Sequence, residues 1–236
     1  QLVSYLDVCF PEFASAFSTI HGKGAYAVLS EYPSAEKVAN ANIVKLSGIL
    51  KNNSHGKLGR VRAETIKQLA KHSVASKNCD MSFQLRNTIG QVRLIEIQLD
   101  DVEKAINEAF DSLDSVIRTV PGIGAINGSM ILSEIGDIKR FSNPGQLIAF
   151  AGLDPIVRQS GNFRAKTTRM SKRGSSTLRY ALVNAAWNVS LNNATFKAYY
   201  DEKVAQKGRH YAALGHVAGK LVRVIFSMLK NDAVFN

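Results

Sequence analysis

Apolar residues recur at alternating steps of four and three residues along one stretch of the chain. The positions that follow this repeat are Met81, Leu85, Thr88, Val92, Ile95, Leu99, Val102, Ile106, Ala109 and Leu113, and of these only Thr88 is not apolar. A 3.5-residue repeat of this kind is typical of a coiled-coil seam. The pattern therefore predicts a coiled-coil helix over residues 79–114, on the order of 50 Å long at about 1.5 Å per residue.

The predicted seam needs an apolar partner, and the sequence allows more than one. The partner can be the same helix of a second copy of the chain, or an earlier helix of the same chain such as residues 60–77. A long helix within an ordinary bundle is the alternative. We favour dimerisation, because a repeat sustained over four heptads exceeds what packing in a bundle requires.

Helical periodicity also dominates on both sides of this stretch, whereas strand signals are scarce. Helices are expected at residues 26–32, 34–39, 43–50, 63–72, 126–135, 145–150, 175–190, 195–205 and 211–229. Ser142, Asn143 and Pro144 predict the start of the 145–150 helix, with a capping side chain followed by proline in the first turn. Tyr180 and Trp187 share the 175–190 helix with several leucine and valine residues, so we expect both in the core.

The fold class is therefore mainly α. We expect a helical lead-in at residues 1–78, the coiled-coil helix at 79–114, and a C-terminal helical domain at 115–236. Between the predicted helices, residues 154–174 form a loop or short hairpin that contains Gly161 and Gly174. No apolar run reaches the ~18 to 20 residues of a membrane-spanning helix, and Lys220 and Arg223 interrupt the apolar stretch near the C-terminus, so no membrane span is expected.

Residues 120–125, Val-Pro-Gly-Ile-Gly-Ala, join the long helix to the next predicted helix. Gly122 and Gly124 let the backbone turn tightly and direct amide groups outward at a helix start, where such amides bind phosphate. This arrangement is similar to a helix-hairpin-helix, a motif that holds the DNA backbone without reading bases. A packing corner between two helices uses the same residue types, and the sequence leaves the two interpretations open.

Charge is distributed very unevenly along the chain. The formal net charge is +11, of which residues 1–118 contribute +1 and residues 119–236 contribute +10. No aspartate or glutamate occurs from Pro155 to Tyr200, and the basic residues of that window include Arg158, Arg164, Lys166, Arg169, Lys172, Arg173 and Arg179. Such a density of positive charge favours a polyphosphate partner, so we interpret these residues, with Gly122 and Gly124, as a nucleic-acid-binding surface.

The basic loop also contains alcohols that permit phosphoryl chemistry. Ser160 lies between Arg158 and Arg164, and a serine hydroxyl becomes a useful nucleophile only with a base or metal and with cations that stabilise the attacked phosphate. Ser171 is the rival nucleophile, for which we favour a structural role. Asp154 either orients an arginine or begins a turn before Pro155, and we favour the turn. The acidic residues and histidines show no metal-ligand spacing, so no metal site is expected.

Several ordered motifs in the basic half resemble the C-terminal domain of bacterial insertion-sequence transposases, in the group named after IS110, IS116 and IS902. The motifs are Val-Pro-Gly-Ile-Gly at 120–124, Leu-Ser-Glu-Ile-Gly-Asp at 132–137, Ala-Gly-Leu-Asp-Pro at 151–155, Gln-Ser-Gly at 159–161 and Met-Ser-Lys-Arg-Gly at 170–174. The resemblance covers roughly residues 112–200. The coiled coil and the helical lead-in match the group in layout more than in residues.

This resemblance implies a recombinase whose C-terminal serine attacks the DNA backbone and becomes covalently linked to it. By motif position, that serine is Ser160. Members of the group also have an N-terminal RuvC-like domain with four acidic metal ligands, and some are guided by a structured RNA. The 236 residues contain no such acidic set, so we expect a fragment that has no cofactor of its own, with a divalent metal such as Mg²⁺ held in the missing domain.

The leading hypothesis is therefore a fragment of a DNA transposase that binds element-end DNA and supplies Ser160 for strand cleavage and rejoining, inactive without the RuvC-like domain. Its expected partners are DNA, a guide RNA in the manner of some members, and a second copy of the chain through the coiled coil. The expected location is the bacterial cytoplasm, in association with the nucleoid. The alternative is a non-catalytic DNA- or RNA-binding dimerisation module, and a helical scaffold leaves the basic loop unexplained.

Overall fold

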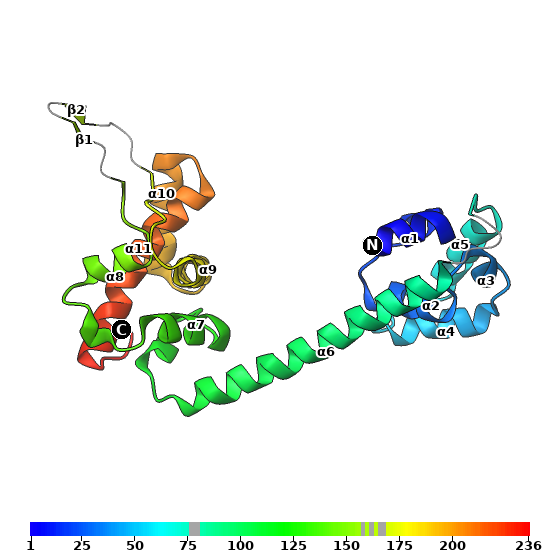
Figure 1. The fold of residues 1–236 in the computed structure, drawn as a ribbon, viewed down its shortest axis with the longest axis horizontal. Helices are drawn as coiled ribbons and strands as arrows, with labels where there is room; N and C mark the ends of the chain where they lie inside the picture. Colours follow the sequence, from blue (N-terminus) through cyan, green and yellow to red (C-terminus); the bar gives the residue numbers. More distant parts are fainter. Residues whose placement is uncertain (76–80, 157–158, 161–162, 165–168) are drawn as a thin grey trace. The chain divides into compact units, whose positions relative to one another are not determined.

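The computed structural model describes residues 1–75, 81–156, 159–160, 163–164 and 169–236, and the side chains at 157–168 and at Lys207 lie outside that description. Helices make up most of the described chain, which confirms the mainly α fold class. The chain separates into two compact units, Gln1–Asp100 and Asp101–Asn236, and the boundary falls within the long helix α6 (Ser82–Ser112) (Figure 1).

The first unit is built from short helices around an aromatic and aliphatic core. Its elements before α6 are α1 (Leu2–Cys9), the 3-10 helix η1 (Pro11–Ala16), α2 (Lys23–Glu31), α3 (Ala35–Ala39), α4 (Ile43–Asn52) and α5 (Arg60–Lys71). Phe10 and Phe13 are fully buried, with ring centroids 5.4 Å apart. Leu85 and Ile89 of α6 are buried in the same core, so the start of the long helix is packed within its own unit.

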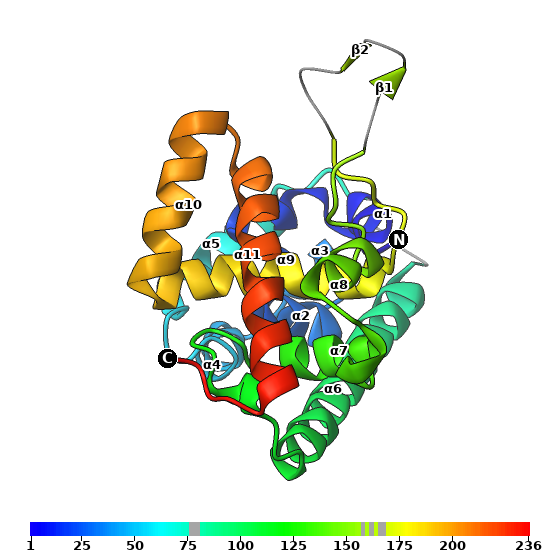
Figure 2. The ribbon, with the colours of Figure 1, turned by 90° about the vertical axis from the view of Figure 1, so that its left-hand side faces the viewer.

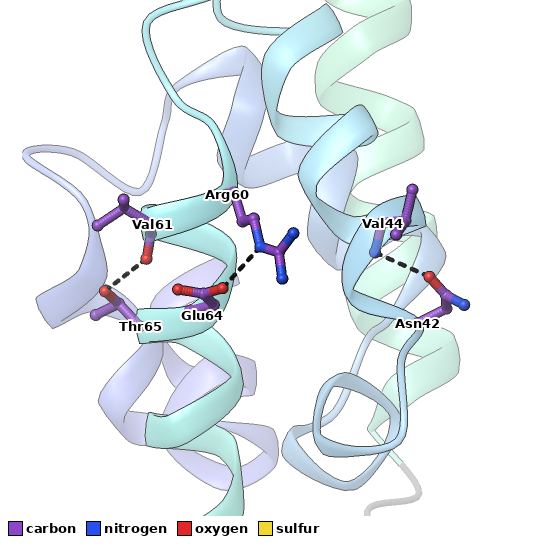
Figure 3. A network of polar contacts seen from close by, with 6 residues as sticks. All are labelled: Asn42, Val44, Arg60, Val61, Glu64 and Thr65. Carbon is purple, nitrogen blue, oxygen red and sulfur yellow. Dashed lines mark hydrogen bonds and ion pairs between the residues drawn. The ribbon is translucent and has the colours of Figure 1, made fainter.

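A local hydrogen bond explains where α4 begins, and an ion pair lies on the exposed face of α5 (Figure 3). The Asn42 side-chain oxygen accepts from the backbone N–H groups of Val44 (2.8 Å) and Lys45 (3.2 Å), which caps α4. On α5, Arg60 Nε lies 2.9 Å from Glu64 Oε1, one helical turn away. This ion pair is exposed, so its contribution to stability is small.

The second unit is arranged around one central helix. Its elements after α6 are η2 (Val116–Thr119), α7 (Ala125–Ile135), η3 (Ile138–Arg140), α8 (Pro144–Phe150), β1 (Gln159–Ser160), β2 (Phe163–Arg164), α9 (Ser176–Asn192), α10 (Ala194–Lys207) and α11 (His210–Asn231). Helix α9 contacts α7, α10 and α11, and α11 also packs on α8 (Figure 2). The buried side of α9 is rich in small residues, with Ala181, Ala185 and Ala186 fully enclosed.

Helix α11 is the one helix in the described part of the chain that is long and apolar enough, by length and composition alone, to cross a membrane. Its buried residues run from Ala213 to Met228, and those from Val217 onward belong to the core of the second unit. The packing of this face against α8, α9 and α10 accounts for the apolar composition that the sequence analysis noted.

The segment between α8 and α9 contains the two strands. β1 and β2 are antiparallel, with Gln159 opposite Arg164 and Ser160 opposite Phe163. The prediction of a loop or short hairpin at 154–174 is therefore correct for the backbone of these residues. Strands of two residues each leave the fold class unchanged.

The long helix α6 extends over Ser82–Ser112, within the predicted 79–114. Its ends are buried at Leu85 and Phe110, whereas Ile95, Leu99 and Val102 are 54%, 56% and 54% exposed. The middle of the predicted seam therefore presents an apolar stripe to solvent in the single chain. Pairing of this stripe in a coiled coil stays a prediction, as does the helix-hairpin-helix at residues 120–125.

Candidate nucleic-acid interface

We call residues 154–174 the basic segment. Backbone hydrogen bonds join its two ends where they meet the helices of the second unit, and we call this junction the root. Ile156 N donates to Arg169 O (2.7 Å), Ser171 N to Asp154 O (2.8 Å) and Lys172 N to Gly152 O (3.0 Å). Pro155 and Met170 also form an isolated antiparallel bridge. The residues that enter and leave the segment therefore run side by side where they meet the helices.

Two glycines allow this close approach. Gly152 has a φ of +65°, and a Cβ there would lie 2.8 Å from Arg179 Nη1 and 2.8 Å from the backbone nitrogen of Gly174. A Cβ on Gly174 would lie only 1.9 Å from the carbonyl oxygen of Phe150. Both positions exclude any side chain, so the end of α8 and the approach to α9 are locked against each other.

The rival nucleophile Ser171 has a defined partner at this root. Its hydroxyl donates to Asp154 Oδ1 at 2.5 Å, and its backbone N–H donates to the Asp154 carbonyl. Asp154 thus joins the two ends of the segment through side chain and backbone alike. An arginine partner or a turn was predicted for Asp154, and its serine partner is 17 residues away in sequence.

The start of α9 is capped from within the unit. Ser175 Oγ accepts from Leu178 N (3.0 Å) and donates to Glu134 Oε2 (2.7 Å), while Ser175 N donates to the Phe150 carbonyl (2.7 Å). Glu134 is therefore held beside the basic residues that precede α9. This carboxylate lies outside the acid-free window in sequence but close to it in space.

Three of the predicted basic residues are exposed at this root. Arg169, Lys172 and Arg173 all present exposed side chains. Lys172 has a left-handed backbone with a φ of +55°, an uncommon conformation for a residue with a side chain. These cations thus lie on a stretch of chain whose backbone is fixed at Arg169 and Lys172 by the hydrogen bonds described above.

Arg179 has a role inside the unit. Its Nη1 donates to the Ala151 carbonyl at 3.2 Å, and the side chain is half-buried. A cation at the C-terminal end of α8 is favourable because the last helical carbonyls carry partial negative charge. Arg179 therefore supports the root, and contact with a phosphate stays a prediction.

The remaining predicted residues of the segment cannot be placed in the same way. Ser160 and Arg164 are paired backbone positions of β1 and β2, but their side chains lie outside the described residues. Arg158 and Lys166 lie outside the described residues altogether. The nucleophile assigned to Ser160 stays a prediction.

The turn at residues 120–125 packs against α9. Gly122 has a φ of +89°, and a Cβ there would lie 2.7 Å from the carbonyl carbon and oxygen of Asn188. Gly122 is therefore needed for packing, the role that the alternative interpretation gave it. Gly124 is exposed at the start of α7, and a Cβ there would meet nothing within 4 Å. Phosphate binding by Gly122 and Gly124 stays a prediction.

Among the residues that the structure describes, no group of three or more His, Cys, Asp or Glu side chains is placed to hold a metal ion. The two carboxylates at this junction, Asp154 and Glu134, instead accept hydrogen bonds from Ser171 and Ser175.

The core assignment of Tyr180 and Trp187 is wrong, since their side chains are 63% and 37% exposed. Trp187 is edge-packed against Tyr200 and His210, with centroids 5.5 and 5.1 Å away, and His210 is in turn 5.0 Å from Tyr211. We call Trp187, Tyr200, His210 and Tyr211 the aromatic cluster. The Tyr200 hydroxyl and His210 Nδ1 share a hydrogen bond of 2.6 Å. No sequence spacing predicts this cluster, because its members come from three helices, α9, α10 and α11.

Comparison with known proteins shows that part of the basic half is similar to a described protein family. Residues 114–201 match the family described as Transposase IS116/IS110/IS902 family. The chain is 24% identical over 235 residues to an uncharacterised 44.8 kDa protein of insertion element IS116 from Streptomyces clavuligerus, covering 95% of this chain and 57% of that protein.

Two further relatives have similar coverage. The mini-circle putative transposase for IS117 of Streptomyces coelicolor is 25% identical over 251 residues, covering all of this chain and 59% of the relative. The pilin gene-inverting protein of Moraxella bovis is 25% identical over 207 residues, covering 87% of this chain and 63% of the relative. The chain thus spans less than two thirds of the length of each of these relatives.

Proposed function

Residues 114–201 match the family described as Transposase IS116/IS110/IS902 family, and on this basis we propose that the chain is part of a DNA transposase that holds element-end DNA through its basic segment. One observation carries the proposal: Arg169, Lys172 and Arg173 are all exposed where the basic segment returns to the helices, within a window of the matched domain that contains no acidic residue. The phosphate backbone is the ligand that such a surface favours.

On this proposal Ser160 is the nucleophile. Its Oγ attacks a backbone phosphorus, the bond from phosphorus to the departing DNA oxygen breaks, and a phosphodiester links serine to DNA. The hydroxyl proton passes to a base and the departing oxygen takes up a proton. Attack by a DNA hydroxyl on that link rejoins the strand and frees the serine. Nearby cations stabilise the charge that develops on the phosphate.

The same proposal assigns the metal chemistry to residues outside this chain. A RuvC-like domain would hold a divalent metal such as Mg²⁺ on its acidic residues. A guide RNA and a bacterial cytoplasmic location in association with the nucleoid belong to the proposal as well, by analogy with the resemblance described above.

The experiment is to incubate the full-length transposase with labelled element-end DNA and to look for protein–DNA adducts that survive denaturation. Ser160→Ala should abolish the adduct and leave DNA binding within about twofold, because a hydroxyl contributes little to binding compared with the phosphate contacts. Ser171→Ala tests the rival nucleophile and should keep the adduct, because the backbone hydrogen bonds that join the two ends of the segment remain. An adduct that persists in Ser160→Ala would contradict the assignment, and an adduct lost only in Ser171→Ala would transfer the role.

The alternative is a non-catalytic DNA- or RNA-binding dimerisation module, in which the exposed apolar stripe at Ile95, Leu99 and Val102 pairs two copies of the chain. It predicts binding without any covalent adduct in the same experiment.

A further inference from the structure

One exposed face of α9 presents aromatic rings where an ordinary surface helix presents charges. Tyr180, Trp187 and Leu191 are 63%, 37% and 58% exposed, and their spacing of seven and four residues places them on one side of the helix. Asn184, on the same side, is half-buried. This face therefore offers flat apolar surface together with an amide group.

The aromatic cluster fixes the orientation of one of these rings. Trp187 meets Tyr200 at 65° and His210 at 85°, and the hydrogen bond between Tyr200 and His210 joins the two neighbours. Tyr211, 79% exposed, extends the surface at the start of α11. A ring that is held in place loses little conformational entropy when a ligand stacks on it.

Charge indicates which class of ligand fits. Helix α9 contains no acidic residue, and its N-terminal end follows directly on the exposed cations Lys172 and Arg173. In space, Glu134 lies at the N-terminus of α9, where it accepts a hydrogen bond from Ser175. The nearest acidic residues in sequence are Asp201 and Glu202 on α10. They pair with Lys197 and Lys203 at 3.0 Å, and the hydrogen bond from Lys203 lowers the pKa of Glu202. Aromatic rings beside a cationic turn match unpaired nucleotides, whose bases stack and whose phosphates are negative.

We propose that the α9 face formed by Tyr180, Trp187 and Tyr211 binds unpaired nucleotides by base stacking, with their phosphates directed toward Lys172 and Arg173. Tyr180 and Trp187 are two helical turns apart, about 10.5 Å along the axis, which corresponds to about three steps of a stacked strand. The inference rests on the proposed function, because it gives the transposase domain a place for a strand that has left its duplex.

The single tryptophan of the chain makes the site directly observable, since its emission comes from Trp187 alone. The 236-residue chain is titrated with a short single-stranded oligodeoxynucleotide and, separately, with the same sequence as a duplex. We expect the single strand to quench Trp187 emission and the duplex to leave it nearly unchanged, although both bind.

Substitution then separates stacking from charge. Tyr180→Ser should weaken binding of the single strand about tenfold, as expected for the loss of one base–aromatic stack, and leave duplex binding unchanged. Tyr211→Ser should act in the same direction. Phe83→Ser is the matched control, because it removes an aromatic ring that is 70% exposed on α6, and it should change neither affinity.

Three results would overturn the inference. If the Tyr180 variant binds both DNAs normally, or loses both equally, this face does not stack bases, yet the proposed function stands as long as duplex binding persists. If Trp187 emission changes with protein concentration and not with DNA, the face is a protein interface. If the chain binds neither DNA, the proposed function fails together with the inference.

Discussion

At the scale of single residues, the glycines at the root of the basic segment have the strictest requirement. Gly174 lies so close to the Phe150 carbonyl that even one added carbon would collide with backbone atoms, which cannot move aside as a flexible side chain does. From the sequence, Gly174 was predicted only to lie in the loop or short hairpin at residues 154–174. Its actual role depends on α8 and on the segment crossing it, which no local pattern contains.

We expect Gly174→Ala to destabilise the second unit by about 3 kcal/mol or more, because the new methyl group forces the two crossing backbones apart. The measurement is urea unfolding followed by Trp187 emission, which reports on this unit. Gly219→Ala is the control: its added Cβ would have only Arg223 nearby, at 3.9 Å, within helix α11, and alanine there should stabilise by about 0.5–1 kcal/mol. Equal midpoints for Gly174→Ala and the unmodified chain would refute this account of the root.

The conformation of some residues is determined by their neighbours in sequence, and that of others by helices distant in sequence. The cap of α8 was predicted correctly, and Asn143 Oδ1 does accept from Gln146 N at 3.1 Å, because a cap depends only on its immediate neighbours. The placement of Tyr180 and Trp187 was wrong because α9 is surrounded by three helices. Close packing on three sides favours Ala181, Ala185 and Ala186 inside, which leaves the largest rings outside.

At the scale of elements, the long helix shows what periodicity predicts and where it stops. The repeat predicted helix α6 correctly, since 3.5-residue spacing of apolar residues is a property of the helix itself. The repeat did not show which apolar residues are buried within the chain and which are exposed to solvent. Leu85 is buried in the first unit and Phe110 in the second, whereas Ile95, Leu99 and Val102 remain exposed.

We expect this exposed stripe to pair two or more copies of the chain. Leu99→Glu should weaken self-association at least tenfold, because it places a charge in the seam while the single chain tolerates it at a position that is 56% exposed. Sedimentation velocity at micromolar concentration measures the change. Ile97→Glu is the control, because Ile97 is 59% exposed and lies off the seam. This variant should associate normally. A monomeric unmodified chain would refute the pairing.

At the scale of the whole molecule, charge was the most informative property of the sequence. A net charge of +10 in the second half directed attention to residues 155–200, and Arg169, Lys172 and Arg173 from that window are exposed in the structure. The contribution of Glu134 was not visible, because its approach to Ser175 depends on how α7 packs beside the start of α9. Composition therefore indicated the class of partner, and packing decides which cations face it.

We expect duplex binding by the chain to depend steeply on salt, and Lys172→Ala combined with Arg173→Ala to reduce the log–log slope by about 2, at about 0.9 per lost phosphate contact. Fluorescence anisotropy over a range of salt concentrations gives the slope. Arg93→Ala combined with Lys104→Ala removes the same charge from the exposed face of α6 and should leave the slope unchanged. Equal slopes for both double variants would mean that net charge alone determines affinity.

The joining of Asp154 to Ser171 has a consequence for how such a protein can diversify. The two ends of the basic segment are bonded to each other. The packing of the supporting helices therefore does not depend on how many residues lie between these ends. Doubling that number costs only about 0.6 kcal/mol of closure entropy. The segment can therefore be lengthened, shortened or exchanged for another while the support stays the same, so that new substrate preferences can arise without a new fold.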